Sequence, residues 1–351
     1  MEANLLTQEK AIGLLGADAR PYMRKPALAF AGTGWIGRSR LHAIVNTGLA
    51  EVKTLADPSE EMRSQACMLA PAAECCDSFD SFRCSGHDAV VIATPSAMHA
   101  EQAIASLESG AAVFCQKPLG RTVSETAHVV EAARRANRLL MVDFSYRYAK
   151  AMQEVYACVR DGGIGDVFAA DLVFHNAYGP DKAWFYDPKQ SGGGCVIDLG
   201  IHLVDLALWV MGYPEIVACT SSLMNKGKPW HPHAQAVEDY AAAQMTTRAG
   251  AVINLACSWN LAAGCDAVIK AAFYGTSGAA VFRNVGGSFF DFAAFRNDGT
   301  RRSVLFDGTD EWFGRAAADF VQRLAENPSF DPAAEEVTAA ARVIDMIYQR
   351  S

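Results

Sequence analysis

A glycine-rich turn between an apolar run and a helical pattern restricts the fold of this chain more than any other feature. Residues 27–45 read ALAFAGTGWIGRSRLHAIV, in which Gly32, Gly34 and Gly37 have the spacing G-x-G-x-x-G. In such a motif the first glycine permits a tight turn, the second lets the backbone approach a pyrophosphate, and the third allows close helix–strand packing. The helix N-terminus would stabilise the anion. We therefore predict a dinucleotide site that includes Gly32, Thr33, Gly34, Trp35, Ile36 and Gly37.

Strands and helices continue to alternate through the first part of the chain. Residues 51–70, 87–110 and 111–137 each begin with a short apolar run and continue with helical spacing, and residues 138–148 supply a further strand. Strands that alternate with helices at this spacing indicate a parallel, doubly wound sheet.

The pattern changes after about Tyr148. One helix is expected over residues 149–160, and strand-like runs then follow at 166–178, 215–225, 238–259, 267–284 and 288–296. Turn residues between these runs favour hairpins, and hence an antiparallel sheet. We expect an α/β protein with an extension at 1–24, a Rossmann domain at 25–147 and an α+β domain with an open, mostly antiparallel sheet at 148–351. The final forty residues have helical spacing, and these helices can pack back on the first domain.

Charge and composition exclude several partners. A net charge of −8 argues against binding to nucleic acid, which normally requires a basic excess. The apolar runs fall short of the roughly 20 residues that a membrane helix requires, so no membrane partner is expected. The start of the chain lacks the pattern of a secretory signal, so we expect a cytoplasmic protein. The 10 cysteines have neither zinc-module nor disulfide-framework spacing and are interpreted as buried, reduced thiols.

Asp57 lies twenty positions after Gly37, at the expected end of the second strand. An acid at this position would accept hydrogen bonds from the hydroxyls of an adenosine ribose and would repel a 2′-phosphate. The sequence therefore favours NAD over NADP. The alternative is that Asp57 only caps the next helix.

Three polar residues share one face of an otherwise apolar helix expected between Gly192 and Leu206. Asp198 and His202 are four positions apart, and Asp205 follows three positions later, so all three project from the same side of a regular α-helix. The three glycines that precede the helix are typical of backbone that approaches a ligand. The stripe is interpreted as part of a catalytic site without metal, while a buried structural network and a metal site remain open alternatives.

The order of these segments resembles the Gfo/Idh/MocA oxidoreductases, the family of glucose–fructose oxidoreductase and inositol dehydrogenase. The similar segments are AGTGWIG, ATPSAMHAEQA, QKPLG, SYRY, WFYDPKQSGGG, DLGIHLVD and IDMIYQRS, which cover the chain from about Lys25 to its end. The resemblance implies a Rossmann domain followed by an α/β domain. It also implies that the sheet of the second domain forms a homodimer or homotetramer interface.

The resemblance places Lys117, Asp198 and His202 at the catalytic site. It implies that Lys117 contacts coenzyme and substrate, that His202 is the acid/base group, and that Asp198 helps to hold the substrate. The remaining residues that the resemblance places near the coenzyme are Thr94, Pro95, Ser96, His99, Gln116 and Arg147. The loop before the catalytic helix interleaves aromatic and polar side chains, which suits a sugar ring, and we expect Tyr178 and Trp184 to contact the substrate.

One residue departs from the family pattern. The usual Glu-Lys-Pro is here Gln116-Lys117-Pro118. The change removes a negative neighbour from Lys117, although the amide can still bind a ribose hydroxyl. We expect it to affect the rate and pH optimum and to leave the class of reaction unchanged.

The groups themselves suit alcohol oxidation. An imidazole can remove a hydroxyl proton near neutral pH, an ammonium can stabilise the developing alkoxide, and NAD accepts hydride. We expect hydride transfer between NAD, less so NADP, and a secondary hydroxyl of a sugar, inositol or related polyol. The alternatives are a glycan-cleaving hydrolase or lyase that uses tightly bound NAD, and a non-catalytic sugar-binding regulator.

Overall fold

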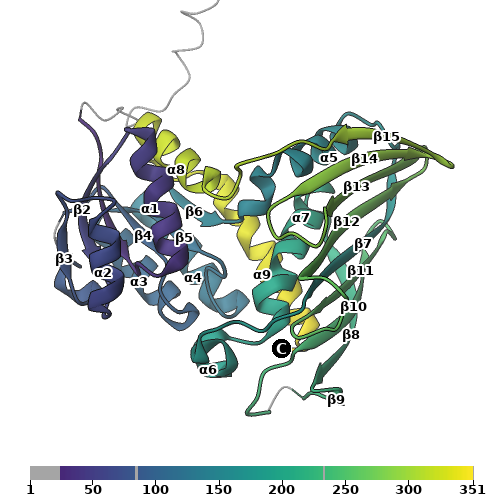
Figure 1. The fold of residues 1–351 in the computed structure, drawn as a ribbon, viewed down its shortest axis with the longest axis horizontal. Helices are drawn as coiled ribbons and strands as arrows, with labels where there is room; N and C mark the ends of the chain where they lie inside the picture. Colours follow the sequence, from purple (N-terminus) through teal and green to yellow (C-terminus); the bar gives the residue numbers. More distant parts are fainter. Residues whose placement is uncertain (1–23, 84–85, 232–233, 351) are drawn as a thin grey trace, which may run out of the picture.

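The computed structural model describes residues 24–83, 86–231 and 234–350. Apart from Arg24, the extension expected at 1–24 lies outside the described residues. The described chain contains two sheets, one in each half of the molecule shown in Figure 1.

The first sheet is parallel throughout. Within the described residues it has six strands in the order β3-β2-β1-β4-β5-β6. This is the doubly wound order, in which the chain adds strands on one side of β1 up to β3 and then on the other side from β4 onward. Its central strands are buried because helices cover both faces. The elements are β1 (Ala27–Ala31), α1 (Trp35–Thr47), β2 (Glu51–Ala56), α2 (Glu60–Cys67), β3 (Glu74–Cys76), β4 (Ala89–Ile92), α3 (Ser96–Glu108), β5 (Ala112–Gln116), α4 (Val123–Ala136) and β6 (Leu140–Asp143).

The second sheet is mixed and mostly antiparallel. In the described part of the chain it has nine strands in the order β15-β14-β13-β12-β7-β11-β10-β8-β9, and of these pairs β7–β11 is parallel. The strands are β7 (Val167–Asn176), β8 (Ile216–Asn225), β9 (Lys228–Pro229), β10 (Tyr240–Thr247), β11 (Val252–Ser258), β12 (Ala267–Gly275), β13 (Gly278–Asn284), β14 (Phe292–Asp298) and β15 (Arg301–Phe306). The expected α/β fold is confirmed, and the strands β3, β9 and β15 are additions to it.

Helices cover one face of the second sheet (Figure 1). Every second residue along β7 points toward these helices, and the side chains at those positions, Ala170, Leu172 and Phe174, are buried. The helices are α5 (Lys150–Arg160), α7 (Ile201–Val210) and α9 (Glu336–Ile347), and the shorter helical segments of the chain are Phe79–Ser81, Ser145–Tyr148, Ala183–Tyr186, α6 (Pro188–Ser191) and Pro332–Glu335. Figure 1 draws no helix from the described residues on the opposite face.

Helix α8 (Arg315–Glu326) returns to the first domain and packs beside α1 (Figure 1). Its buried side chains join the core that contains Leu28 and Phe30, and the rings of Phe320 and Phe114 lie 5.4 Å apart. The return of the chain fixes the two sheets relative to each other, because α8 packs on the first sheet while α9 packs on the second.

Two expectations from composition are corrected. Cys67 at the end of α2 and Cys75 in β3 form a disulfide, because the pairing of β3 with β2 brings Cys75 beside α2. They are therefore not buried, reduced thiols, whereas Cys115, Cys195 and Cys257 are buried and free.

Among the described residues one helical stretch, Pro188–Val210, reaches the length and mean hydropathy (1.6) of a membrane span, contrary to expectation. Its window is 89% buried inside the protein, as in a core helix.

Candidate active site

The glycine turn has the geometry that a dinucleotide requires. Gly32 has φ +88°, and a Cβ there would lie 2.5 Å from the carbonyl oxygen of Ala93. A Cβ on Gly37 would lie 2.2 Å from the carbonyl oxygen of Gly32, so this glycine permits the close packing of α1 on β1. A Cβ on Gly34 would meet nothing within 4 Å, so the backbone there faces open space. The buried hydroxyl of Thr33 has no hydrogen-bond partner within the described structure, as expected of an atom that awaits a ligand.

Asp57 fastens this turn to the end of β2. Its carboxylate accepts hydrogen bonds from the backbone N–H groups of Thr33 (2.8 Å) and Ser59 (2.9 Å). The guanidinium of Arg63 donates to its carbonyl oxygen at 2.5 Å. Both carboxylate oxygens therefore have one protein partner, and their remaining lone pairs are available to a ribose hydroxyl.

Lys117 and Asp198 meet across the two domains. Lys117 follows the last residue of β5 and precedes a cis peptide bond to Pro118. Its Nζ lies 2.8 Å from Oδ1 of Asp198 and 2.6 Å from the Asp198 carbonyl oxygen. The other carboxylate oxygen of Asp198 accepts a hydrogen bond from Nε1 of Trp259 at 3.1 Å. The fold thus brings together an ammonium from the first domain and a carboxylate from the second.

The helix that carries Asp198 is not a regular α-helix, which corrects the sequence expectation. Val196–Gly200 forms a π-helical turn, and α7 begins only at Ile201. A π-turn inserts an extra residue, so Asp198 and His202 do not keep the four-residue register of an α-helix. One oxygen of the Asp198 carboxylate accepts from Lys117 and the other from Trp259, and the described structure records no hydrogen bond between Asp198 and His202.

His202 packs against an aromatic ring, and its pKa is lowered by two cations. Its ring is 4.9 Å from the ring of Tyr146 in an edge-on arrangement, and its buried Nδ1 has no partner among the described residues. Burial, together with the charges of Lys117 and Arg40, lowers the pKa of His202 well below its usual range. The imidazole is therefore neutral at pH 7 and able to accept a proton.

Asp205 takes no part in the contact between Lys117 and Asp198. Its carboxylate binds the guanidinium of Arg147 at 2.5 and 2.8 Å, and Arg147 also donates to the hydroxyl of Tyr213 at 2.7 Å. The pairing separates Asp205 from the stripe expected on one helix face, so a metal site of Asp198, His202 and Asp205 lacks its third ligand. It also commits the Arg147 guanidinium, predicted to lie near the coenzyme, to a contact within the protein.

The three glycines before Cys195 serve a different purpose from the one expected. A Cβ on Gly194 would lie 1.8 Å from the carbonyl oxygen of Glu238, and one on Gly193 would lie 2.1 Å from the hydroxyl of Tyr348. These glycines allow close approach to other parts of the chain, so the prediction of an approach to a ligand is not supported here. The fully buried carboxylate of Glu238 accepts hydrogen bonds from the N–H groups of Gly194 (2.9 Å) and Val196 (2.9 Å). Glu238 therefore caps the helix, a role that no local sequence signal indicated.

Gln116 belongs to a buried network that explains its departure from the family pattern. Its amide nitrogen donates to Oδ2 of Asp143 at 2.7 Å, and the same oxygen accepts from Nε of Arg40 at 2.5 Å. Arg40 and Asp143 are 1% and 0% exposed. A glutamate at position 116 would place a second carboxylate against Asp143, whereas the amide donates a hydrogen bond to it.

We therefore expect Gln116→Glu to change both the stability and the pH–rate profile. Two carboxyl groups in one buried site cannot both ionise without cost, so one of them retains its proton above the usual pH. The variant should lose about 1–3 kcal/mol of unfolding free energy at pH 8. Because the unfolded chain releases that proton at lower pH, the deficit should shrink toward pH 5. Denaturant titrations and kcat/KM profiles measure both effects.

The matched control is the exposed Gln153→Glu, for which we expect neither effect. Identical stability and pH–rate profiles for the Gln116→Glu variant and the wild type would show that Gln116 is not coupled to the reaction.

The loop expected beside the coenzyme is held by His99. The ring nitrogens of this buried residue lie 2.7 Å from the carbonyl oxygens of Pro118 and Thr94. The hydroxyl of Thr94 donates to Gln102 at 2.7 Å, Pro95 is half-buried and Ser96 is buried. Burial lowers the pKa of His99, against the opposite effect of its two carbonyl partners. His99 thus joins the loop after β4 to the loop that carries Lys117.

The two aromatic residues expected at the substrate differ in their surroundings. Tyr178 is 56% exposed and donates to Asp266 at 2.5 Å, while Trp184 stacks on Phe185 with ring centroids 3.8 Å apart. Trp259 lies at the site through its bond to Asp198 and was not predicted from the sequence. It ends a strand-like run, and the packing of Val196–Gly200 against β11 brings it to the helix that carries Asp198.

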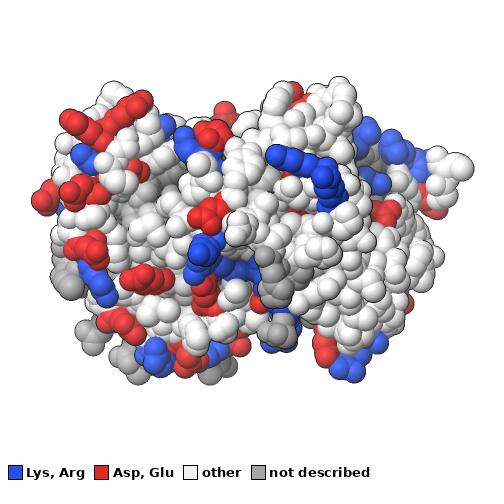
Figure 2. Space-filling model, turned by 90° about the horizontal axis from the view of Figure 1, so that it is seen from below, with Lys and Arg blue, Asp and Glu red and all other residues white. Residues whose placement is uncertain are grey.

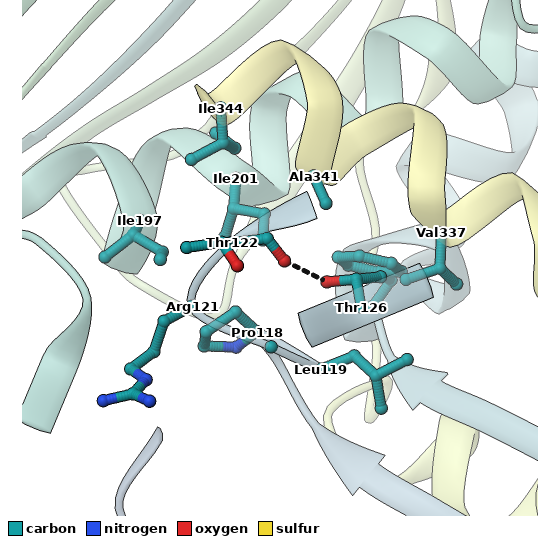
Figure 3. A pocket seen from close by; sticks show the side chains of 12 residues that line it. Pro118, Leu119, Arg121, Thr122, Thr126, Ile197, Ile201, Val337, Ala341 and Ile344 are labelled. Atoms are coloured by element: carbon teal, nitrogen blue, oxygen red, sulfur yellow. Dashed lines mark hydrogen bonds between the residues drawn. The ribbon is translucent and has the colours of Figure 1, made fainter. Parts of the chain in front are cut away.

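Apolar side chains gather around the loop that follows Lys117 (Figure 3). Pro118 and Leu119 from this loop, Ile197 and Ile201 from the helix that carries Asp198, and Ile344 from α9 line a common pocket. Packing of these side chains stabilises the contact between the two domains beside Lys117 and Asp198.

The fold and the glycine turn define a two-domain dinucleotide-binding protein. Residues 27–144 match the oxidoreductase family with an NAD-binding Rossmann fold, and residues 152–281 match the GFO/IDH/MocA C-terminal domain. The chain belongs to the Gfo/Idh/MocA oxidoreductase family, which confirms the resemblance noted in the sequence.

Curated relatives include sugar dehydrogenases. The chain is 27% identical over 206 residues to D-glucoside 3-dehydrogenase of Escherichia coli (strain K12), an alignment that covers 56% of this chain and 59% of the relative. It is 30% identical over 232 residues to D-apiose dehydrogenase of Paraburkholderia graminis, covering 66% of this chain and 60% of that protein. The chain thus spans about three fifths of the length of these relatives.

Solved structures share the whole fold. Levoglucosan dehydrogenase in complex with NADH and levoglucosan has a TM-score of 0.80 at 22% identity, covering 93% of this chain and 97% of that chain. A 3-ketoreductase from Actinomadura kijaniata in complex with NADP and TDP-benzene has a TM-score of 0.78 at 20% identity, covering 93% and 98%.

Proposed function

We propose that this protein is an NAD-dependent oxidoreductase that transfers a hydride between the nicotinamide and a secondary hydroxyl of a sugar, inositol or related polyol. The observation that carries this proposal is the 2.8 Å contact between Lys117 and Asp198, beside the neutral His202. The contact lies just after the carboxyl end of β5. This strand belongs to the first sheet, where the glycine turn after β1 has space for a pyrophosphate. Ligands of doubly wound sheets bind outside these strand ends.

Each side chain has a chemical task in the oxidation direction. His202 accepts the hydroxyl proton as the O–H bond breaks, because its lowered pKa keeps the imidazole unprotonated at neutral pH. The Lys117 ammonium stabilises the negative charge that develops on the substrate oxygen. Asp198 holds Lys117 in place and offers its remaining lone pairs to a neighbouring hydroxyl. When bound, NAD supplies the hydride acceptor.

The coenzyme contacts form part of the same proposal. The turn Gly32–Gly37 would hold the pyrophosphate and Asp57 the adenosine ribose. Gln116 would hold the second ribose through the amide N–H that its bond to Asp143 leaves free. The loop Thr94–Ser96 would lie near the nicotinamide. We do not propose that His99 or Arg147 touches the coenzyme, because both are committed to partners within the protein.

The coenzyme preference follows from Asp57. Its carboxylate should repel a 2′-phosphate, although relatives of this fold bind NAD or NADP. We expect kcat/KM with NAD to exceed that with NADP by about tenfold or more. Asp57→Ala should narrow this ratio, as measured by initial rates with each coenzyme; a wild-type preference for NADP would contradict the assignment of Asp57.

A panel of sugars, glycosides and inositols assayed with NAD tests the proposal. We expect NADH absorbance to rise with at least one polyol. A glycan-cleaving hydrolase or lyase with tightly bound NAD would release a cleaved glycan without net NADH. A non-catalytic regulator would bind sugar without turnover. Either result would replace the proposed function.

The surface charge bears on the partners of the protein. On the face shown in Figure 2, acidic and basic side chains are interspersed over the first domain, which does not favour a nucleic acid partner. We propose a small polyhydroxylated substrate, a cytoplasmic enzyme, and a homodimer or homotetramer through the second sheet. Fractionation of cells and light scattering of the purified protein test the last two.

A further inference from the structure

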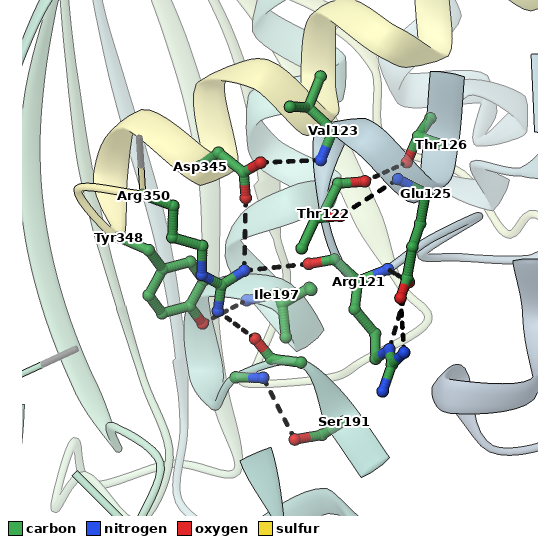
Figure 4. A network of polar contacts seen from close by, with 12 residues as sticks. Arg121, Thr122, Val123, Glu125, Thr126, Ser191, Ile197, Asp345, Tyr348 and Arg350 are labelled. Carbon is green, nitrogen blue, oxygen red and sulfur yellow. Dashed lines mark hydrogen bonds and ion pairs between the residues drawn. The ribbon is translucent and has the colours of Figure 1, made fainter. Parts of the chain in front are cut away.

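The end of the chain forms a set of polar contacts with both loops of the candidate active site (Figure 4). Helix α9 supplies Asp345, and Tyr348 and Arg350 directly follow the helix. We call these three residues the C-terminal clamp. None of them was among the site residues expected from the sequence.

Arg350 contacts the two loops at once. Nη1 of its guanidinium donates to the carbonyl oxygen of Arg121 at 3.0 Å, and Nη2 donates to the carbonyl oxygen of Gly192. Arg121 lies four residues after Lys117, in the loop from the first domain. Gly192 lies six residues before Asp198, in the second domain. A planar guanidinium presents donors in a fixed fork, so it sets the separation of these two carbonyl groups.

The other clamp residues hold the same loops. Asp345 accepts a hydrogen bond from the N–H of Val123 at 2.8 Å and lies 3.4 Å from Arg350. The hydroxyl of Tyr348 accepts from the N–H of Ile197 at 3.3 Å, next to Asp198, and donates to Glu238 at 2.7 Å. The guanidinium of Arg350 lies 4.1 Å above the Tyr348 ring. The clamp is therefore one connected unit, anchored on both sides of the contact between Lys117 and Asp198.

We propose that Arg350 is a positioning residue that holds the Lys117 loop in register with the helix of Asp198 and His202. The proposal rests on the proposed function, because it assigns Arg350 to the geometry of the same reaction. Hydride and proton transfer require reacting atoms to be placed within a fraction of an ångström, so a small displacement of Lys117 lowers the rate steeply. The glycine turn and Asp57, which would hold the pyrophosphate and the adenosine ribose, lie outside the clamp, so most of the coenzyme affinity should not depend on Arg350.

The test compares Arg350→Ala, Arg350→Lys and the exposed Arg342→Ala, which removes a charge from α9 outside the clamp. We expect Arg350→Ala to lower kcat by about 10–100-fold with the Kd for NADH unchanged within about twofold. Its primary deuterium isotope effect on kcat should rise as hydride transfer becomes slower. Arg350→Lys should recover little, because an ammonium lacks the planar fork. Arg342→Ala should match the wild type.

Amide hydrogen exchange provides a readout that does not need turnover. In Arg350→Ala, exchange should quicken together in residues 119–123 and 192–198, while the glycine turn stays unchanged. The milder Arg350→Lys serves the same comparison if the alanine variant does not fold. Unchanged kcat, a kcat loss without faster exchange in both segments, or a kcat loss matched by Arg342→Ala would each overturn the proposal. A wild-type enzyme inactive on the whole panel would instead count against the proposed function, and the exchange result would still decide the role of Arg350.

Discussion

Replacing Lys117 with methionine is expected to lower kcat about 10³-fold while leaving NADH binding nearly intact. Methionine keeps the length and much of the volume of the side chain but removes the ammonium. The variant therefore loses the charge that stabilises the developing alkoxide, and Asp198 loses its partner at 2.8 Å. Initial rates at saturating NAD, together with fluorescence titration of NADH, measure the two quantities.

The Lys117→Met substitution should also raise the pKa of His202. The charge of Lys117 is one of the causes that lower the pKa of this imidazole, so its removal should move the pKa back toward the usual value. Lys53→Met, at an exposed position of β2, is the control for the loss of a lysine. Retention of more than about a tenth of the wild-type kcat would rule out an electrostatic role for Lys117 in the reaction.

His202→Asn should lower kcat by about 10²–10⁴-fold because asparagine cannot accept the hydroxyl proton. The pH dependence gives a sharper result. Since the pKa of His202 lies well below its ordinary value, the acidic limb of kcat/KM in the wild type should fall below about pH 6.5. Above that limb His202 is neutral and can act as base; below it the imidazolium cannot.

In the asparagine variant this limb should disappear, and the residual rate should rise with pH as hydroxide replaces the lost base. Circular dichroism and the Kd for NADH are the controls for folding and coenzyme binding. An unaltered acidic limb in the variant would mean that another group is the base.

The side chain of Gln116 is explained by contacts that the sequence does not reveal. Sequence alone showed an amide where the family has a carboxylate, and it could only predict an effect on Lys117. The structure supplies the reason for the amide, because Asp143 on the neighbouring strand β6 pairs with β5 at this position. Asp143 and Arg40 are distant in sequence from Gln116, so no local pattern could connect them.

The same limit applies to the catalytic helix. Apolar spacing predicted a helix with Asp198 and His202, and both lie on it. The cap by Glu238 and the pairing of Asp205 with Arg147 depend on groups 42 to 58 residues away in the chain. Local periodicity reports only neighbours within a few turns, and a regular α-helix was therefore the wrong expectation in detail.

What the sequence determined by itself is the alternation of strands and helices, the glycine turn, and the identity of the groups that can bind a coenzyme and move a proton. These follow from short-range physics: hydrophobic periodicity, the conformations open to glycine, and side-chain chemistry. Only the tertiary structure decided which of these groups meet. Packing of the two sheets, α8 and the C-terminal clamp brings Lys117 to Asp198, because such long-range contacts form only when distant apolar faces are buried together.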